Sequence, residues 1–396
     1  MKLKIKFSII SLFILKLVIS KPILKFNNNN QFKIIQFTDL HYGSEPVDDI
    51  DTIFSQVNIL DYEKPDLVIL SGDMVTGYEE QFEDDDRNYW KYWNVFTRPF
   101  VERNIPWAIT FGNHDGEGAL STNEILKIDQ TFNLSLSQSN PVEMHGIANY
   151  VLKISSSNSL KSEPASLVYI FDSSTKGCSK LDWGCVHQDQ VDWFKNTSKS
   201  FNKTDSIAFV HIPPVEIIDL WNNYPVYGNY SETSCCFDND YGDFVSSLVE
   251  SGDVHGLYFG HDHENDFHGD YKGVDLGYGR KSGAGSYSSK KPLGARVFQL
   301  TESPFTLSTW IREEDGNIVS QVIHPPSEFD RKPLQCKMKD KYSKKELIAI
   351  KVIGGFLIFL GIVVVGLIGF FGFKHYKKYE FKKQYQEFKK YSNCIL

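Results

Sequence analysis

The chain contains little cysteine, no internal repeat and no excess of basic residues. Its 396 residues include only 6 cysteines, and none stands in a Cys-x-x-Cys pair, so a structural zinc site of that kind is not expected. The absence of a repeat argues against a solenoid. Lysine and arginine number 42 against 50 aspartates and glutamates, which gives a formal net charge of −8. A nucleic-acid partner is therefore not expected.

Long apolar runs are confined to the two ends of the chain. Residues 1–20 place three lysines before an apolar stretch, which is typical of a secretory signal peptide. An uncleaved anchor is the alternative, because Lys16 interrupts that stretch. Residues 352–373 carry no charge, and these 22 residues are enough to cross a hydrocarbon core of about 30 Å. We therefore predict a transmembrane helix over residues 347–373.

Composition divides the remainder of the chain into four segments. They are a polar linker over residues 21–30, one folded domain over 31–325, a charged stalk over 326–346 and a basic tail over 374–396. The positive-inside rule places the tail in the cytosol, and the signal peptide decides the orientation because the flank before the span is also basic. The sequence thus predicts a single-pass type I membrane protein whose domain is extracellular or lies in the lumen of the secretory or endolysosomal pathway. Residues 305–311 and 318–323 are expected to form a hairpin that closes the domain.

Cysteines and glycosylation sequons agree with an oxidising compartment. Sequons stand at Asn133, Asn196, Asn202 and Asn229. Five cysteines precede the predicted span, namely Cys178, Cys185, Cys235, Cys236 and Cys336. At least one of them is therefore unpaired or bonded to another chain. A disulfide between Cys178 and Cys185 would close a short loop and is the pairing most easily expected.

Polar strings follow apolar, β-branched runs that are typical of buried strands. The runs cover residues 33–38, 66–70, 107–111, 207–210 and 256–259. The strings are Asp39-Leu40-His41, Gly72-Asp73, Gly112-Asn113-His114-Asp115 and Gly260-His261-Asp262-His263, and His211 stands alone after the fourth run. The first two strings are common by chance when taken alone, the two four-residue strings are rarer, and a lone histidine is more often a core or surface residue. Ligands bind at the carboxyl ends of strands in open α/β sheets, so all five in this order predict one shared site.

These strings supply carboxylate, amide and imidazole ligands for two metal ions. We assign Asp73 as the bridge, with Asp39, His41 and His263 completing the first set and Asn113, His211 and His261 the second. Two divalent ions about 3.5–4 Å apart clamp the attacking and leaving oxygens of a phosphoryl transfer. Two carboxylates and a hydroxide leave such a centre positive. An anionic substrate is therefore favoured despite the net charge of −8.

The motif set resembles that of the calcineurin-like metallophosphoesterase superfamily between Gln31 and Thr301. Tyr278-Gly279-Arg280-Lys281-Ser282-Gly283, followed by Gly294-Ala295-Arg296-Val297, is similar to the C-terminal end of the purple-acid-phosphatase-like branch. A purple acid phosphatase has a tyrosine three residues after the bridging aspartate, where this chain has Thr76. The resemblance therefore implies a centre without the chromophore, in which His41 takes the place of the tyrosine.

The same resemblance implies the cofactor and the fold. The expected cofactor is a pair of divalent or trivalent ions, with iron, zinc or manganese as candidates. The expected fold class is α/β (α+β), a four-layer αββα sandwich of two mixed β-sheets flanked by helices, with the transmembrane helix in addition. Fold likeness alone does not establish an activity, so the argument for function depends on the site residues.

His114 is the candidate catalytic residue. It follows a predicted ligand, so its ring is expected near the substrate, where it stabilises the phosphoryl group or protonates the leaving alkoxide. Asp115 or another nearby carboxylate is expected to raise the pKa of His114 and fix its tautomer. The alternative is that His114 only binds a backbone carbonyl. Asp262 is expected to support the ligands beside it or to lie on the surface, and Arg280 and Lys281 are expected to be exposed rather than to bind phosphate.

The sequence therefore predicts a binuclear metal-dependent phosphoesterase. The expected reaction is hydrolysis of a phosphomonoester, on a small molecule or a phosphoprotein, by attack of a metal-bound hydroxide. Two alternatives stay open. One is a non-catalytic membrane receptor or binding module that keeps the fold, and the other is a phosphodiesterase acting on nucleotides or lipid head groups. The oligomeric state is left open.

Overall fold

The computed structural model describes residues 21–337, apart from 84, 159, 179–180, 288–290 and 327–330, together with 367, 369–370, 373–380 and 382. The predicted signal peptide, most of the predicted transmembrane span and the end of the predicted stalk lie outside these residues. Within the described residues, no helix is both long and apolar enough to cross a membrane. The chain divides into two units, of which the second begins at Asp340, and the fold below is that of the first.

A five-stranded sheet is built mainly by the first part of the chain. Its order is β14-β13-β2-β3-β4, from β2 (Gln31–Phe37), β3 (Leu67–Ser71), β4 (Trp107–Thr110), β13 (Gly294–Thr301) and β14 (Thr306–Glu313). Strands β2, β3 and β4 are parallel, while β13 runs antiparallel to both of its neighbours. The carboxyl ends of β2, β3 and β4 therefore meet at one edge.

A nine-stranded sheet is built mainly by the second part of the chain. Its order is β1-β5-β6-β8-β10-β12-β11-β9-β15. The strands are β1 (Leu24–Lys25), β5 (Tyr150–Ser155), β6 (Pro164–Ile170), β8 (Ser206–Phe209), β9 (Val226–Tyr227), β10 (Val254–Phe259), β11 (His268–Tyr271), β12 (Val274–Tyr278) and β15 (Ile323–His324). The central strands β6, β8, β10 and β12 are parallel to one another. The five strands that precede the predicted site residues are thus confirmed as β2, β3, β4, β8 and β10.

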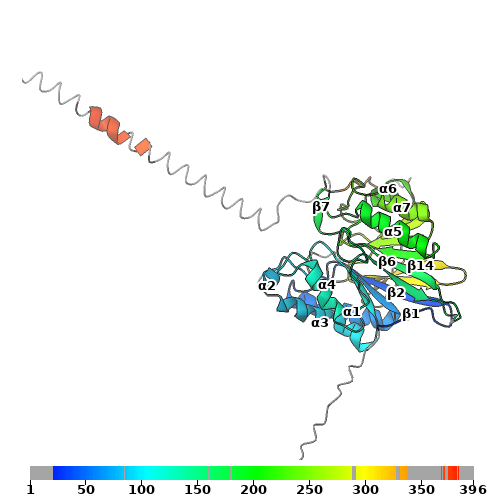
Figure 1. Ribbon diagram of the computed structural model, residues 1–396. Coiled ribbons are helices and arrows are strands. Elements are labelled where there is room, and N and C mark those ends of the chain that lie inside the picture. Colours follow the sequence, from blue (N-terminus) through cyan, green and yellow to red (C-terminus); the bar gives the residue numbers. More distant parts are fainter. Residues whose placement is uncertain are drawn as a thin grey trace, which may run out of the picture. The chain divides into compact units, whose positions relative to one another are not determined.

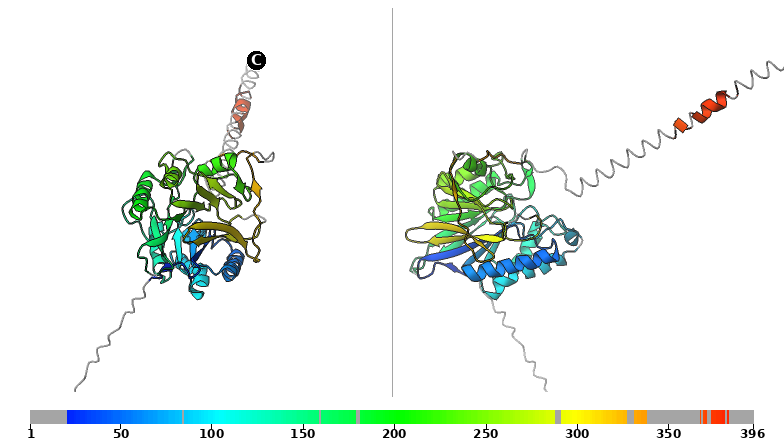
Figure 2. Two further views of the ribbon diagram at one scale, coloured as in Figure 1. Left: turned by 90° about the vertical axis from the view of Figure 1, so that its right-hand side faces the viewer. Right: turned by 180° about the vertical axis from the view of Figure 1, so that it is seen from behind.

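Helices cover the outer face of each sheet, and the two sheets face each other between them (Figure 1). On the side of the five-stranded sheet lie α1 (Pro46–Glu63), α2 (Glu80–Glu83), α3 (Arg87–Glu102) and α4 (Thr122–Gln130), and on the other side lie α5 (Gln188–Ser200), α6 (Glu216–Asn223) and α7 (Phe244–Ser251). The same succession of helix, sheet, sheet and helix is visible from behind in Figure 2. This arrangement is the expected mixed α/β sandwich of two mixed sheets.

Aromatic side chains pack between the two sheets. The ring of Phe298 on β13 lies 5.4 Å from that of Phe209 on β8 and 4.4 Å from that of Tyr258 on β10, between centroids. All three side chains are buried. Large rings in these offset contacts bury much apolar area and stabilise the pair beyond that area. The face-to-face packing of the sheets fixes which strand ends lie opposite each other.

The predicted domain boundaries are too narrow. Leu24 and Phe26 are buried, and Leu24 pairs with Ile154 on β5, so residues 21–30 are part of the domain rather than a polar linker. Leu334 is also buried, although it falls in the predicted stalk. In both segments, one or two apolar side chains among polar neighbours are enough to dock the backbone on the core.

The predicted closing hairpin forms only beside its turn, where the Val319 N–H donates to the Ile311 carbonyl oxygen at 3.0 Å. Strand β14 pairs along its whole length with β13 on its other side. Of the expected pairing, an isolated bridge between Arg312 and Ile318 is present, and β15 joins β9 in the nine-stranded sheet. The chain does turn between these segments, since the Gly316 N–H donates to the Glu313 carbonyl oxygen at 2.9 Å, but a turn does not fix the main partner of the strand before it.

Two disulfides join described cysteines. Cys178 is bonded to Cys185, as the short spacing predicts, and β7 (Lys176–Cys178) carries the first of them. The second disulfide, Cys236–Cys336, spans 100 residues and ties residue 336 to the domain. Cys235 is the odd, half-buried thiol that the count required.

Candidate metal centre

The seven predicted ligands meet between the two sheets. Asp39 and His41 follow β2, Asp73 follows β3, Asn113 follows β4, His211 follows β8, and His261 and His263 follow β10. Every one of them is buried, with an exposed fraction no higher than the 8% of His261. Buried carboxylates and imidazoles at this density require compensating charge or hydrogen bonds.

Asp73 is shared by two groups of metal-ligating side chains. Asp39, His41, Asp73 and His263 form one group, and Asp73, His211 and His261 form the other, with donor atoms of each group within 4.8 Å of one another. The Asp73 Oδ2 atom lies 3.6 Å from His41 Nε2 and 3.3 Å from His211 Nε2. Asn113 Oδ1 lies 3.3 Å from the same His211 nitrogen. The two groups correspond to the two predicted ligand sets.

Backbone carbonyls orient two of the imidazoles. His211 Nδ1 lies 2.9 Å from the carbonyl oxygen of Ser71, and His263 Nδ1 lies 2.8 Å from that of Tyr287. A carbonyl only accepts, so each Nδ1 carries a proton, and the neutral form of each ring then offers its Nε2 lone pair to a metal ion. The Nε2 atoms of His41 and His263 are 3.1 Å apart and face each other. Lone pairs converging on one point suit a shared cation.

The backbone at the ligand positions is unusual. Asp39, His41 and Asp73 have φ values of 54°, 51° and 53°, and His261 has 75°. Such left-handed conformations are unfavourable for residues with a Cβ, and they gather at functional sites where the surrounding structure enforces them. The sharp turns bring these side chains back over the strand ends.

Two glycines allow the close approach of the loops. Gly72 has a φ of 101°, and a Cβ there would lie 2.4 Å from His211 Nδ1. Gly112 does not need a positive φ, but a Cβ at Gly112 would lie 2.1 Å from Asp73 Oδ1. Gly72 is therefore needed for its positive φ, whereas Gly112 is required because the Asp73 carboxylate packs against its backbone.

Asp115 plays a different part from the one predicted. Its buried carboxylate accepts backbone N–H groups of Asp73 at 2.9 Å, Met74 at 2.8 Å, Val75 at 3.2 Å and Gly112 at 2.8 Å. It thereby ties the loop after β3 to the loop after β4. Burial, followed by the charge of Asp73, raises the pKa of Asp115 to about 7. With these four partners, Asp115 positions ligands rather than the ring of His114.

The ring of His114 is bonded instead to Glu117. His114 Nδ1 lies 2.6 Å from Glu117 Oε2, and its backbone N–H donates to Asp73 Oδ1 at 2.8 Å. Burial lowers the pKa of His114, but the charges of Asp73 and Glu117 outweigh it and leave that pKa raised. Sequence reasoning left room for another carboxylate but did not identify Glu117. The spacing of three residues within one loop was the signal that could have found it.

Three aromatic rings surround the histidines, and the sequence pattern did not indicate them. Tyr78 meets His114 edge-on with 4.8 Å between centroids, and Trp183 meets His261 edge-on at 4.5 Å. Tyr287 stacks on His263 at 4.0 Å. They come from loops far apart in the chain, so only the fold brings them together.

Polar residues around the centre are buried more often than predicted. Asp262 supports the site as expected, because it accepts the Tyr278 hydroxyl at 2.6 Å and the Cys235 N–H at 3.0 Å. Lys281 was expected on the surface but is only 4% exposed, and its Nζ donates to the carbonyl oxygens of Asp39 and Gly285 at 3.1 and 2.9 Å. It ties the loop after β2 to the loop that leads to Tyr287.

Arg280 was also expected to be exposed, and it is buried too. Its Nη1 lies 2.5 Å from Asp266 Oδ2 and its Nη2 lies 2.9 Å from Glu313 Oε1. Two carboxylates compensate the buried charge, which is the condition under which an arginine is tolerated inside. Neither basic residue is free to receive a substrate phosphate.

Electrostatics keep the bridging carboxylate ionised. Burial raises the pKa of Asp73, but the neighbouring His211, His114 and His41 outweigh burial and hold it well below its ordinary value. An ionised, buried carboxylate between converging imidazole lone pairs is the chemistry expected of a cation ligand. The donor set therefore fits a pair of metal ions.

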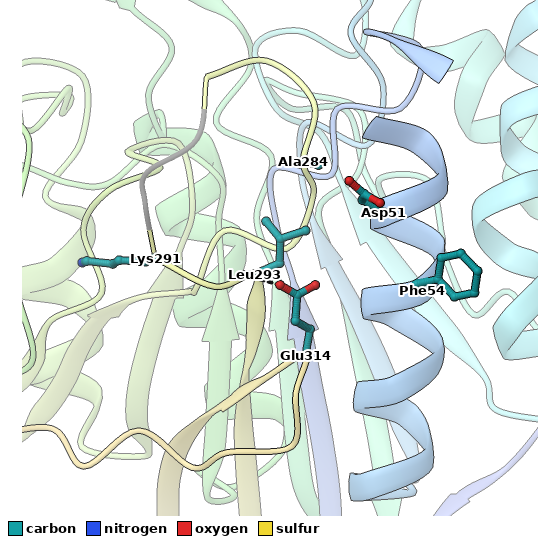
Figure 3. A pocket seen from close by; sticks show the side chains of 6 residues that line it. All are labelled: Asp51, Phe54, Ala284, Lys291, Leu293 and Glu314. Atoms are coloured by element: carbon teal, nitrogen blue, oxygen red, sulfur yellow. Dashed lines mark hydrogen bonds between the residues drawn. The ribbon is translucent and has the colours of Figure 1, made fainter. Parts of the chain in front are cut away.

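A separate cavity of about 400 Å³ lies beside α1 (Figure 3). It is lined by Asp51, Phe54, Ala284, Lys291, Leu293 and Glu314. None of these six residues is a predicted ligand or faces His114 in an observed contact. The cavity is therefore not the candidate site.

Residues 32–265 match the family described as calcineurin-like phosphoesterase. This match covers more than half of the chain, and the chain belongs to that family. The resemblance predicted from the motifs is confirmed.

Named relatives place the chain near the purple acid phosphatases. A protein of Arabidopsis thaliana named probable inactive purple acid phosphatase 14 is 30% identical over 344 residues, covering 74% of this chain and 83% of the relative. Phosphatase DCR2 of Saccharomyces cerevisiae is 29% identical over 275 residues, covering 62% of this chain and 46% of the relative. A solved dimetal phosphatase from Danio rerio has a TM-score of 0.49 and 12% identity, covering 75% of this chain and 99% of that one.

Proposed function

We propose that this chain is a binuclear metal-dependent phosphoesterase that hydrolyses phosphomonoesters. The observation that carries the proposal is the sharing of Asp73 between two groups of buried donors. Members of the calcineurin-like family use a dimetal centre, and the match of residues 32–265 to that family supports the same use here. Imidazole with carboxylate ligands suits zinc, iron and manganese, and metal analysis of the purified protein decides among them.

The residues of the site fall into metal ligands and one proton donor. Asp39, His41 and His263 would hold one ion with Asp73, and Asn113, His211 and His261 would hold the other. When bound, two such ions lower the pKa of water and stabilise the attacking and leaving oxygens of phosphoryl transfer. His114 lies at the edge of the centre, with its ring centroid 5.5 Å from that of His41. It is placed to donate a proton to the leaving oxygen.

We also infer that the domain works outside the cytosol, attached to a membrane by residues 347–373. The disulfides Cys178–Cys185 and Cys236–Cys336 support an oxidising compartment. All four sequon asparagines are exposed, as glycosylation requires. Expression in a eukaryotic cell tests this inference. Removal of N-glycans by a glycosidase should increase gel mobility, and a protein whose mobility does not change would contradict the inference.

Turnover by the full-length protein in detergent tests the activity. We would assay p-nitrophenyl phosphate and its bis-ester with manganese, iron or zinc at about pH 5 and about pH 7.5, on either side of the usual histidine pKa. Monoester turnover that disappears with a chelator and returns with metal is expected. Faster turnover of the diester would replace the proposal by a phosphodiesterase. No turnover by metal-loaded protein would favour a binding module, in line with the name of the Arabidopsis thaliana relative, probable inactive purple acid phosphatase 14.

A further inference from the structure

The loop after β4 brings a carboxylate to the ring of His114. Glu117 stands three residues after His114, and its Oε2 lies 2.6 Å from His114 Nδ1. The Glu117 N–H also donates to the His114 carbonyl oxygen at 3.4 Å, which closes a turn between them. The two side chains are therefore neighbours because the loop is bent, not because a distant element supplies the acid.

Both ends of this loop are anchored. Before the pair, the His114 N–H donates to Asp73 Oδ1 at 2.8 Å. After it, the Ala119 N–H donates to the Phe82 carbonyl oxygen at 2.7 Å. A Cβ on Gly118 would lie 2.6 Å from that oxygen, so the loop packs closely against the end of α2. Glu117 is thus held on a fixed backbone although its side chain is 36% exposed.

The other carboxylates near His114 are committed elsewhere. Asp115 accepts four backbone N–H groups, and none of its hydrogen bonds goes to the His114 ring. The Asp73 carboxylate faces the ligand histidines and the His114 backbone. Tyr78 meets the His114 ring edge-on, with an interplanar angle of 72°. Glu117 thus accepts the hydrogen bond from the His114 ring, and Tyr78 packs against that ring.

We propose that Glu117 is a positioning residue that accepts the Nδ1–H of protonated His114, so that the Nε2–H of the same ring faces the leaving oxygen of the substrate. The inference rests on the proposed phosphoesterase function. As a water oxygen forms its bond to phosphorus, the bond to the leaving oxygen breaks and its electron pair stays on that oxygen. The Nε2 proton of the His114 imidazolium passes to this oxygen and leaves a neutral ring whose Nδ1–H stays bonded to Glu117. The attacking water releases one proton to solvent, and solvent returns a proton to His114 Nε2.

If Glu117 orients His114, its loss should affect substrates differently from a residue that only stabilises the fold. An alkoxide is a poor leaving group and needs the proton, whereas p-nitrophenolate departs without it. Misplacing a catalytic group by about 1 Å costs on the order of 100-fold in rate. Glu117→Ala should therefore lower kcat for glycerol phosphate by about 100-fold, with little change in kcat for p-nitrophenyl phosphate and little change in KM. Glu117→Gln keeps an acceptor oxygen and should recover most of the loss.

The experiment uses the full-length, metal-loaded protein and four further variants beside Glu117→Ala. They are Glu117→Gln, His114→Ala, the double variant of His114→Ala with Glu117→Ala, and Glu80→Gln. Glu80 is an exposed acid on α2, so Glu80→Gln is the control for loss of one negative charge near the loop. Because Glu117 acts through His114, Glu117→Ala should have no further effect once His114 is alanine. Thermal melting and metal content check that each variant is folded and loaded.

The outcomes are distinct. Losses confined to glycerol phosphate and absent from the His114→Ala background support the positioning role. Equal losses on both substrates, or losses that add to those of His114→Ala, would overturn it while wild-type turnover keeps the phosphoesterase proposal. An inactive wild-type protein that binds metal would overturn both.

Discussion

The two sheets contribute unequally to the candidate centre. The five-stranded sheet provides both carboxylates, the amide of Asn113 and a single ligating imidazole, and its loops also carry His114 and Glu117. The nine-stranded sheet provides three imidazoles and no carboxylate to either donor group. Neither set is complete alone, because His263 completes the first group and Asp73 the second. The centre therefore forms only where the two sheets pack together. Its negative charge comes from the five-stranded side, and the nine-stranded side adds only imidazoles.

The shared carboxylate should matter more than any imidazole of the opposite half. Asp73→Asn removes the negative charge common to both groups, so we expect loss of both metal ions and a decrease in turnover of about 1000-fold. His261→Ala removes a ligand from one group, so we expect retention of one ion and a smaller decrease of about 10- to 100-fold. Metal analysis and steady-state kinetics measure both effects.

A matched control for the histidine variant lies at the opposite end of β10, the strand that His261 follows. His255 stands at the start of β10 and pairs with Asp205 at 2.6 Å, away from the donor groups. His255→Ala should keep both ions and normal turnover. If Asp73→Asn and His261→Ala released the same number of ions, Asp73 would not be shared in the way the geometry indicates.

A buried arginine joins the two halves and should have the largest effect on stability. Arg280 contacts Asp266, which follows β10 of the nine-stranded sheet, and Glu313 at the end of β14 in the other sheet. Arg280→Met removes the arginine from both carboxylates and leaves Asp266 with Lys291 as its remaining ion-pair partner, and breaking a buried pair in this way costs about 3–5 kcal/mol of the free energy of unfolding. Urea unfolding followed by fluorescence measures it.

The control is Arg98→Met, which removes an exposed ion pair with Glu102 on α3. An exposed pair is worth at most about 1 kcal/mol. Equal losses for the two arginines would show that Arg280 does not hold the sheets together.

A smaller, pH-dependent effect on the free energy of unfolding is expected from Glu63, whose side-chain contacts all lie on the side of the five-stranded sheet. Glu63 at the end of α1 accepts hydrogen bonds from Trp310 at 2.9 Å, Arg312 at 2.6 Å and Lys33 at 3.0 Å. Burial raises the pKa of Glu63, but these three donors outweigh burial and leave it lowered. Because the pKa is lower in the folded state, the carboxylate stabilises the fold above the unfolded pKa of about 4.3, and this contribution is lost as the pH falls further.

Glu63→Gln should therefore lower the free energy of unfolding by about 1–3 kcal/mol at neutral pH. The difference from wild type should shrink as the pH falls below about 4.3 and through the lowered folded-state pKa of Glu63, because wild-type Glu63 becomes neutral there as well. Metal content should not change, since Glu63 contacts none of the donors. Glu102→Gln, at the exposed end of α3, should show little effect at either pH. A Glu63→Gln loss that is constant with pH would contradict the assigned charge.

Local sequence patterns were sufficient to predict the metal-ligating residues that directly follow a strand. Each of β2, β3, β4, β8 and β10 was expected from its apolar run, and each ends at the predicted ligands. Patterns failed where the partner is remote. The strand at residues 306–313 pairs along its whole length with β13 and meets the segment after its turn only near Arg312 and Ile318, because sheet pairing is decided by packing and not by the turn alone.

Charged residues also show that local patterns fail where the partner is remote in the sequence. Lys281 and Arg280 have the composition of a surface segment, but carbonyl and carboxylate partners from other loops make their burial possible. Asp115 and Glu117 are both near His114 in sequence, and only the bend of the loop directs Asp115 to backbone amides and Glu117 to the imidazole.

The sequence by itself determined the donor types, their order and the strand ends that carry them, because apolar periodicity and ligand chemistry are local properties of the chain. The tertiary structure decided which donors share Asp73, which acid meets His114 and which basic residues are buried. These depend on the face-to-face docking of two sheets whose strands are far apart in the sequence, and on close contacts at Gly72 and Gly112 that no local pattern encodes.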